Sequence, residues 1–391
     1  MINVNQQALL ELLKASLFGI EPLFPEGVDW DAVLQEAKDQ TVVALAAPAV
    51  PEEEVEKWRI PAAQNKMRFF QILDEQAKLV KLFQDVGIPL VILKGCAAAM
   101  YYPEPLQRTM GDIDFIVPPE RFEEADSFMV NNGYVFCDDC PRHKKYSKNG
   151  IVFELHKRYS DTRWDLEPLI LNGISEAASY ELYGQRFPAL LNEINGLILL
   201  DHIRMHFYIG LGLRQIIDWM MFVHSSLSVD SAWEEHFLLL VREVRLETFA
   251  MTVTKMCKLW LGLPDRITWC DSADSETAGQ LLKIIFSYGN FGIKEHNSQR
   301  SLEGLIMETS RSGVFHFLQK TGETTWKAYH KHPVLRPFAW LYQAIRFLKN
   351  GVVALFRGER NKVESYHAIK MYKFHKKLGI NYKQKRKKKV E

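Results

Sequence analysis

Two carboxylates, two positions apart, interrupt the apolar run QRTMGDIDFIVPP at residues 107–119. Side chains alternate between the two faces of a β-strand, so we expect Asp112 and Asp114 to share one face, about 6–7 Å apart. Ile113 and Phe115 then lie on the opposite face. Two buried carboxylates at that separation repel each other and are costly to desolvate unless a cation lies between them. Because Mg²⁺ binds a few carboxylates together with water and phosphate oxygens, the pair indicates a magnesium site.

The alternative for an isolated pair is a solvated strand end, and neighbouring segments bear on the choice. With 48 acidic residues in 391, about six acidic-x-acidic triplets are expected by chance. Upstream, VILKG ends an apolar strand, and a small-residue helix follows it. Downstream, the strand IVFELH places Glu154 on the face opposite Phe153 and Leu155. A third carboxylate on a neighbouring strand is what a two-metal phosphoryl-transfer site requires.

The combination of strand-(K)G-helix, R-x-x-GDIDFIV and FELH resembles the nucleotidyltransferases of the DNA polymerase beta-like superfamily. It is most similar to a bacterial branch in which LKG stands where others have Gly-Gly-Ser or Gly-Ser. The downstream pattern H-x-x-x-H…GLGLRQIIDW is similar to the same branch. The resemblance covers roughly residues 30–265, and its motifs are strongest over 91–156.

The resemblance implies transfer of a nucleoside monophosphate from an NTP to an acceptor hydroxyl, with Mg²⁺ or Mn²⁺ as cofactor and pyrophosphate as leaving group. Asp112 and Asp114 match the carboxylates that hold both metals. Glu154 matches a third carboxylate, which orients and deprotonates the acceptor. Gly95 matches the loop that lets a triphosphate approach a helix N-terminus.

Basic residues and a cysteine complete the predicted nucleotide site. Cys96 stands where the commoner pattern has serine, so a hydroxyl contact to phosphate is lost and Lys94 is expected to supply charge instead. Arg108 is expected to clamp a phosphate or to pair with the acidic cluster. Arg214 is expected to face the nucleotide from a helix or to pair with Asp218, four residues later.

Histidines and cysteines offer further ligands. His156 shares a strand face with Glu154 and either borders the site or makes a structural hydrogen bond. His202 and His206 have a zinc-ligand spacing on a helix, but no third ligand is evident, so a metal is not favoured there. The segment CDDCPRH (137–143) offers a partial zinc knuckle, but a second cysteine pair at matching spacing is missing and a polar turn is favoured.

The periodicity predicts an α+β fold, in which a small mixed β-sheet, the nucleotidyltransferase core, is flanked by N- and C-terminal α-helical regions. Asn-Gly between KKYSK and IVFELH is a hairpin signal. We expect a helical region over 1–60, the α/β core over 61–165, a helical domain over 166–310 and a basic, aromatic helical region with a tail over 311–391.

Composition limits the partners and the location. A net charge of +1 does not favour binding to long nucleic acid, which calls for a sustained basic surface. Without a long uncharged apolar stretch, no helix is expected to span a membrane. Residues 338–356 could lie on a membrane surface, although a core helix is favoured. The absence of a signal peptide and the five cysteines favour a reduced, cytoplasmic setting, and the resemblance implies a bacterial protein.

The acceptor is left open between a small molecule, a protein hydroxyl and an RNA end. The alternative from another class is a catalytically weak or inactive nucleotide-binding or scaffold protein that retains the fold. Loss of the serine after Gly95 favours this alternative, and retention of the three carboxylates opposes it.

Overall fold

The computed structural model describes residues 2–160, 165–207, 210–290 and 293–294, together with parts of 315–346 and 371–380. The chain divides into two compact units, residues 1–294 and 295–391. The sheet and every predicted site residue belong to the first unit, which is described by itself below.

Helices precede the sheet, and capping explains where two of them begin. Asn3 Oδ1 accepts a hydrogen bond from the Gln6 backbone N–H (2.8 Å), and the Gln6 side chain accepts one from the Asn3 backbone N–H (3.1 Å). Asp29 Oδ1 accepts hydrogen bonds from the first N–H groups of the second helix. The fourth helix begins before Pro61 and so crosses the boundary expected at residue 60. These helices are α1 (Val4–Phe18), α2 (Trp30–Asp39), α3 (Val43–Ala46) and α4 (Val55–Asp85).

Seven strands form one mixed sheet in the order β3-β4-β5-β2-β1-β7-β6. The pairs β2–β5 and β1–β7 are parallel, and the other neighbours are antiparallel. The predicted α+β class with a small mixed sheet is confirmed. The strands are β1 (Val91–Leu93), β2 (Ile113–Ile116), β3 (Val135–Asp139), β4 (His143–Lys148), β5 (Ile151–His156), β6 (Ala178–Leu182) and β7 (Gln185–Ala189).

The hairpin of β6 and β7 was not expected, because the sequence after about Leu166 was interpreted as helical. It joins the sheet through the parallel pairing of Ile92 with Ala189. The sheet therefore continues past residue 165, where the α/β core was expected to end. Pro188 lies inside β7, and proline is unusual in a strand with a neighbour on each side. This residue argues against a strand when the sequence alone is considered.

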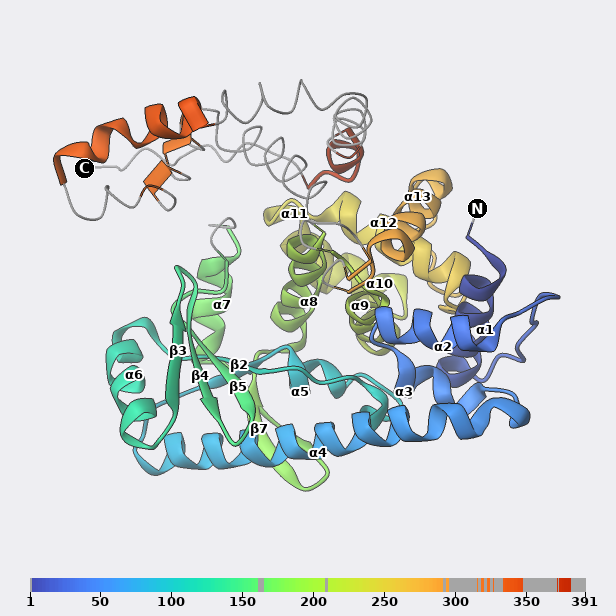
Figure 1. Cartoon of the computed structure of the whole chain (residues 1–391), viewed down its shortest axis with the longest axis horizontal. Helices are drawn as coiled ribbons and strands as arrows, with labels where there is room; N and C mark the ends of the chain where they lie inside the picture. Colours follow the sequence, from blue (N-terminus) through green and yellow to red (C-terminus); the bar gives the residue numbers. More distant parts are fainter. Residues whose placement is uncertain are drawn as a thin grey trace. The chain divides into compact units, whose positions relative to one another are not determined.

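One face of the sheet is closed by helices α4 and α6 (Phe122–Asn131). Figure 1 shows α4 as the long helix that passes beneath the sheet. Phe115 and Phe153, from β2 and β5, are fully buried in this core, and the rings of Phe83 and Phe115 meet edge to face with centroids 5.6 Å apart. Because successive side chains alternate, the neighbours of Phe115 and Phe153 must point to the other face of the sheet.

The rest of the first unit is helical. A short helix follows β1, and α9 is buried at almost every position from Leu213 to Val223, as expected for a helix surrounded by others. These helices are α5 (Gly95–Ala99), α7 (Glu167–Ile174), α8 (Asn192–His206), α9 (Leu213–Ser226), α10 (Asp230–Ala232), α11 (Leu238–Glu243), α12 (Glu247–Trp260) and α13 (Ser275–Tyr288), with a π-helical segment at Trp233–Phe237.

A buried ion pair ties the sheet to α9. Arg108 Nε and Nη2 donate to the two carboxylate oxygens of Asp218 at 2.7 and 2.8 Å, and the Tyr102 hydroxyl donates to the same carboxylate at 2.7 Å. Arg108 is 1% exposed. Burial opposes the charged guanidinium, but the Asp218 charge outweighs burial and raises the pKa of Arg108. The expectation that Arg108 clamps a phosphate or pairs with the Asp112 cluster is therefore wrong, since Asp218 uses its donors.

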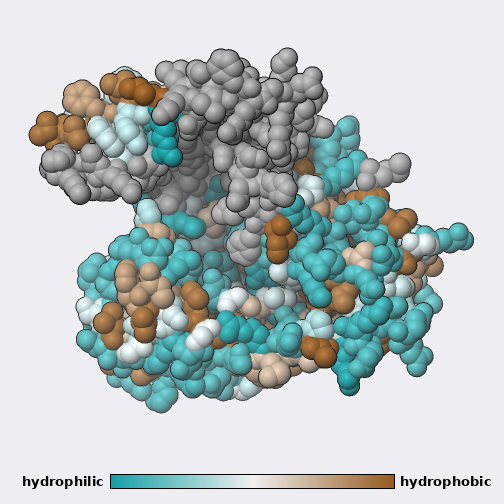
Figure 2. Space-filling model, in the orientation of Figure 1, coloured by the Kyte–Doolittle hydropathy of each residue, from teal (hydrophilic) through white to brown (hydrophobic). Residues whose placement is uncertain are grey.

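The surface of the first unit is largely hydrophilic in the view of Figure 2, with separated hydrophobic spots. No helix in the described part of the chain has the length and apolarity needed to cross a membrane. In the second unit, residues 339–346 are helical after a 3₁₀ turn at Pro333–Phe338. The rest of the 338–356 segment, and the basic tail, lie outside the described residues.

Replacing Asp218 by asparagine keeps the shape of the side chain but leaves the Arg108 charge buried without a counter-ion. We expect D218N to lower the free energy of unfolding by about 3 kcal/mol, the lower end of the cost of breaking a buried pair. Urea unfolding followed by far-ultraviolet circular dichroism measures this change.

The matched control is E181Q, which removes one partner of the exposed Glu181–Arg186 pair. An exposed pair contributes about 1 kcal/mol or less. Equal effects of D218N and E181Q would contradict the structural role given to Arg108.

Candidate active site

The pairing of three adjacent strands gathers polar side chains on the open face of the sheet. Asp114 of β2 is the register partner of Glu154 of β5, and Glu154 is opposite Lys145 of β4. Two residues after Glu154 on β5, His156 is opposite His143 of β4. These five residues share the face opposite Phe115 and Phe153. The predicted Asp114 and Glu154 are thus brought onto neighbouring strands by backbone pairing.

A two-residue turn fixes the pairing of β4 with β5. Asn149 and Gly150 have φ values of 52° and 72°, as a type I′ hairpin turn requires. The predicted hairpin is confirmed. Because the turn sets Lys148 opposite Ile151, every later pair of the hairpin follows, including the pairs at Glu154 and His156.

Asp114 lies at the centre of this polar face and is 4% exposed. Its Oδ1 accepts from Lys94 Nζ at 2.7 Å and contacts His156 Nε2 at 2.9 Å. Burial alone would raise the pKa of Asp114, but the Lys94 charge and the His156 hydrogen bond outweigh burial and hold the pKa well below its usual value. Asp114 is therefore held as a carboxylate.

Asp112 lies immediately before β2, not on it. The alternation argument for a shared strand face therefore covers Asp114 alone, and the expectation for Asp112 is corrected. Asp112 is only partly exposed. Burial, followed by repulsion from Asp114, raises its pKa, although Lys94 and Arg214 oppose this rise.

Glu154 has two basic neighbours on the hairpin. Its Oε1 accepts from Lys145 Nζ at 2.7 Å and is 3.4 Å from His143 Nε2, and its Oε2 is 3.8 Å from His156 Nε2. Burial, followed by the charge of Asp114, raises the pKa of Glu154. A carboxyl group with a raised pKa is better suited to exchange a proton near neutral pH.

Lys94 connects β1 to α5 in a strained backbone conformation. Its φ is 53° and its ψ is −131°, a combination that costs a residue with a side chain on the order of 1–3 kcal/mol. The strained turn presents the ammonium group to Asp114, the second residue of β2. Gly95 follows with a φ of 33°, which its missing Cβ permits.

Cys96 does not take the place of a phosphate-binding serine. Its side chain is fully buried in the hydrophobic core, and burial raises the pKa of the thiol to about 12. The thiol therefore stays protonated and cannot reach a phosphate. The thiol adds no phosphate contact, as the loss of the serine hydroxyl implied, and the predicted part of Cys96 in the nucleotide site is left to its backbone.

Arg214 of α9 faces the carboxylates from the helical side. Its Nη1 donates to the Thr109 carbonyl at 3.3 Å, and burial, followed by repulsion from Arg108, lowers its pKa. The attractive charges are Asp218 and Asp112. The expected pairing of Arg214 with Asp218 is replaced by the Arg108 pair, and Arg214 remains a candidate for contact with a nucleotide.

His202 and His206 of α8 lie near the same charges. Their rings meet edge to face with centroids 4.4 Å apart. Burial lowers the pKa of both, that of His206 to about 3, and the charges of Lys94 and Arg214 add to the shift. Neutral imidazoles therefore border the site, a position that spacing along the sequence could not show.

The chemistry of the three carboxylates suits Mg²⁺. Asp112, Asp114 and Glu154 offer the oxygen ligands that Mg²⁺ prefers. Burial, followed by repulsion from Asp114, raises the pKa of Asp112 and Glu154, and a bound cation would relieve the repulsion. Lys94 and Lys145 neutralise part of this charge from within the chain. The three carboxylates therefore fit Mg²⁺ in ligand type. At Asp114 and Glu154, a lysine side chain competes with the ion.

The described residues also contain a set of three ligand atoms within 4.8 Å of one another, from His143, Glu154 and His156. Cys137 and Cys140 are free thiols and do not belong to this set. The partial zinc knuckle at 137–143 is therefore not formed as a unit, in line with the polar turn that was favoured.

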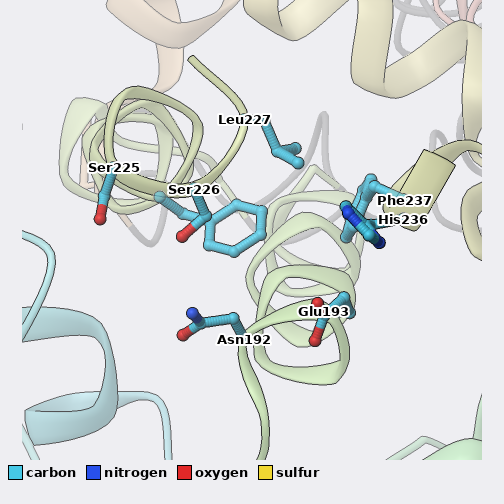
Figure 3. Close-up of a pocket in the computed structure, with 8 residues that line it drawn as sticks. Asn192, Glu193, Ser225, Ser226, Leu227, His236 and Phe237 are labelled. Atoms are coloured by element: carbon cyan, nitrogen blue, oxygen red, sulfur yellow. The ribbon is translucent and has the colours of Figure 1, made fainter. Parts of the chain in front are cut away.

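A small cavity of about 190 Å³ lies among the helices, between the start of α8 and the end of α9. Figure 3 shows Asn192 and Glu193 on one helix, with Ser225, Ser226 and His236 around the opening. None of the predicted site residues lines it. Pockets for ligands of drug size span about 300–1,000 Å³, so this cavity is small for a nucleotide.

Two residues of this polar face were not predicted as site residues. Lys145 was missed, and His143 was considered only as part of the 137–143 segment. The hairpin signal contained enough information to find them. A two-residue Asn149-Gly150 turn places Lys145 opposite Glu154, by counting outward along both strands.

The comparisons with known proteins bear on the family of the chain. A family model described as "Uncharacterised nucleotidyltransferase" matches residues 26–262. Among curated proteins, none matches significantly.

Similar solved structures include ANT(2'')-Ia in complex with adenylyl-2''-tobramycin, at 16% identity and a TM-score of 0.31 over 44% of this chain and 97% of that one. The solution structure of ANT(2'')-Ia matches at 15% identity and a TM-score of 0.30, over 46% of this chain and 90% of that one. A third is an antigenic nucleotidyltransferase-like protein from Paracoccidioides brasiliensis, at 12% identity and a TM-score of 0.31, over 50% and 94%. Because the family match covers more than half of the sequence and includes β1, β2 and the β4–β5 hairpin, the chain belongs to this nucleotidyltransferase family.

Proposed function

We propose that the chain transfers a nucleoside monophosphate from an NTP to a hydroxyl acceptor, with Mg²⁺ or Mn²⁺ bound by Asp112, Asp114 and Glu154. The observation that carries the proposal is the register of Asp114 with Glu154 across two parallel strands. Asp112 stands one residue before β2, at the same edge of the sheet. A bound cation would neutralise phosphate charge and stabilise the charge that develops during transfer.

The three carboxylates differ in a way that suits different tasks. Asp114 is held ionised by Lys94 and His156, as a metal ligand must be. Glu154 has a raised pKa and is suited to accept the proton of the acceptor hydroxyl. In the proposed step, the acceptor oxygen forms a bond to the α-phosphorus, the bond from that phosphorus to the bridging oxygen breaks, and pyrophosphate leaves.

Lys94 and Arg214 are the proposed phosphate contacts. Lys94 Nζ is 2.7 Å from Asp114 Oδ1 on a side chain that is 13% exposed, so a cation at Asp114 would release the ammonium group toward a phosphate. Arg214 approaches Asp112 from α9 and is only partly buried. The two residues come from opposite sides of the site, from the β1–α5 turn and from the helical region.

A specific observation also favours the second candidate, a nucleotide-binding or scaffold protein without transfer activity. Lys94 and Lys145 already neutralise Asp114 and Glu154, and the Cys96 side chain offers nothing to a phosphate. In that case the carboxylate–lysine pairs would be structural. The two candidates differ in whether pyrophosphate is released.

One prediction of this proposal concerns the carboxylates. With the full-length chain, α-labelled NTPs, Mg²⁺ or Mn²⁺ and a cell extract as the source of acceptors, we expect label in an acceptor and release of pyrophosphate. D112N and D114N should each lower the rate at least about 100-fold, because loss of a metal ligand costs several kcal/mol of stabilisation.

D138N is the matched control, because Asp138 is an exposed aspartate on the edge strand β3 of the same sheet. Labelling that survives in D112N and D114N would refute the metal assignment. Nucleotide binding without pyrophosphate release from any acceptor pool would support the scaffold candidate.

The second prediction concerns Lys94. K94M keeps the strained backbone and most of the side chain but removes the charge beside Asp114. We expect Mn²⁺ without nucleotide to bind about tenfold more tightly, since a competing cation 2.7 Å from Asp114 is removed. The KM for NTP should rise, because a phosphate contact is lost.

Free Mn²⁺ measured by electron paramagnetic resonance, together with NTP titration, tests both expectations. K81M serves as the control, since Lys81 pairs with Asp85 on the surface of α4. If K94M left both affinities at the native value, Lys94 would have no part in the site.

A further inference from the structure

The polar face holds a second group of ligands, which the carboxylate triad does not use. His143 and His156 are partners across the β4–β5 pairing, and Glu154 lies two positions before His156 on the same face. All three are at most 7% exposed. Their ligand atoms lie within 4.8 Å of one another.

His143 is the unexplained member of this group. It is 4% exposed, and neither ring nitrogen makes a hydrogen bond with any residue that the structure describes. A buried polar group without a partner costs about 1–3 kcal/mol. A buried polar group of this kind calls for an explanation. A cation bound between the imidazole ring and the carboxylate that it faces would provide one.

The distances are close to the edges of a metal coordination shell. His143 Nε2 is 3.4 Å from Glu154 Oε1, and His156 Nε2 is 3.8 Å from the other carboxylate oxygen, Oε2. One ligand atom from each residue lies within 4.8 Å of the other two. Bonds of about 2.0–2.1 Å in a tetrahedral zinc site place neighbouring ligand atoms about 3.3 Å apart. Small rotations of the three side chains would therefore close the shell.

The ligand types select the metal. Two imidazole nitrogens and one carboxylate oxygen suit late first-row divalent cations, whereas Mg²⁺ prefers oxygen ligands alone. His156 Nδ1 lies 3.4 Å from the Arg158 carbonyl oxygen. A hydrogen bond from this nitrogen would leave Nε2 as the ligating atom, the arrangement that orients many metal-bound histidines.

We propose that His143, Glu154 and His156 form a site for Zn²⁺ or a similar late first-row cation, adjacent to the carboxylates Asp112 and Asp114 and sharing Glu154 with them. His156 Nε2 exchanges its contact with Asp114 for the cation. Lys145 keeps its contact with Glu154 Oε1 or is displaced by the ion. Binding of this cation requires neither NTP nor acceptor, so it can be measured separately from the proposed transfer, although both use Glu154.

Zinc alone, without nucleotide, is the probe for this site. We expect the full-length chain to bind one Zn²⁺ in competition with a chromophoric chelator, and Co²⁺ to give the strong visible absorption of a four-coordinate site. H143Q should weaken binding at least about 100-fold, since it removes a direct ligand, whereas loss of an outer partner costs about 10–100-fold. Excess Mg²⁺ should not displace the zinc.

Two controls separate this site from other ligands of the chain. H236Q changes an exposed histidine and should bind zinc as the native chain does. The double variant C137S/C140S removes the thiols nearest in sequence and should also retain the zinc. E154Q, which keeps the shape of the side chain, should lose zinc in parallel with H143Q and serves if H143Q does not fold.

Native zinc affinity in both H143Q and E154Q, loss of zinc in C137S/C140S, or no stoichiometric zinc in the native chain would each overturn the proposal. Because every measurement is made without NTP, absence of nucleotide transfer would leave the result unaffected. A failed zinc test would likewise leave the carboxylate assignment standing.

Discussion

Repulsion between Asp114 and Glu154 on one face of the sheet, with Asp112 just before β2, is the constraint on which the arrangement of the site depends. At a separation of about 5 Å, typical of directly opposite residues on paired strands, and an effective dielectric constant of about 20, two such charges repel by on the order of a few kcal/mol. The chain places a cation from a different segment near each group: Lys94 from the β1–α5 turn, Lys145 from β4, and Arg214 from α9.

The opposite face of the same strands provides the rigidity that such a cluster needs. Phe115 and Phe153 are fully buried between the sheet and α4. The Arg108–Asp218 pair then fixes α9 against the loop that leads into β2. Arg214, four residues before Asp218, is thereby carried to the carboxylates. A buried pair that takes no part in the proposed chemistry thus positions a basic residue near the carboxylates.

Local patterns were sufficient to predict part of this arrangement. The apolar strand before Lys94, the strand that contains Asp114 and the Asn149-Gly150 hairpin depend on neighbouring residues, and the structure has all three, with Asp112 just before its strand. The pairing of Arg108 with Asp218 spans 110 positions, and no local signal specifies it. The four-residue spacing of Arg214 and Asp218 suggested that these two residues pair. In the structure, Arg108 binds both carboxylate oxygens of Asp218 instead.

Long-range pairing also explains what was missed in the sheet and at Cys96. β7 joins β1 through residues that are 97 positions apart, Ile92 and Ala189, and Pro188 speaks against a strand. The side chain of Cys96 turns into the core because α5 packs on the sheet, and a motif comparison contains no information on that direction. Residue types and spacing predicted the carboxylates, whereas tertiary packing decided which basic residues reach them.

The two-residue turn at Asn149-Gly150 gives the site an unusual sensitivity to chain length. A strand has a period of two, so one residue inserted into β5 after the turn would move each later side chain to the other face. Glu154 and His156 would then point into the aromatic core, and Phe153 and Leu155 into the polar face. Substitutions can alter the chemistry of this hairpin gradually, but an odd insertion inverts it in one step. A change in the length of the hairpin is therefore tolerable only within the turn, because only there does the pairing of β4 with β5 stay the same.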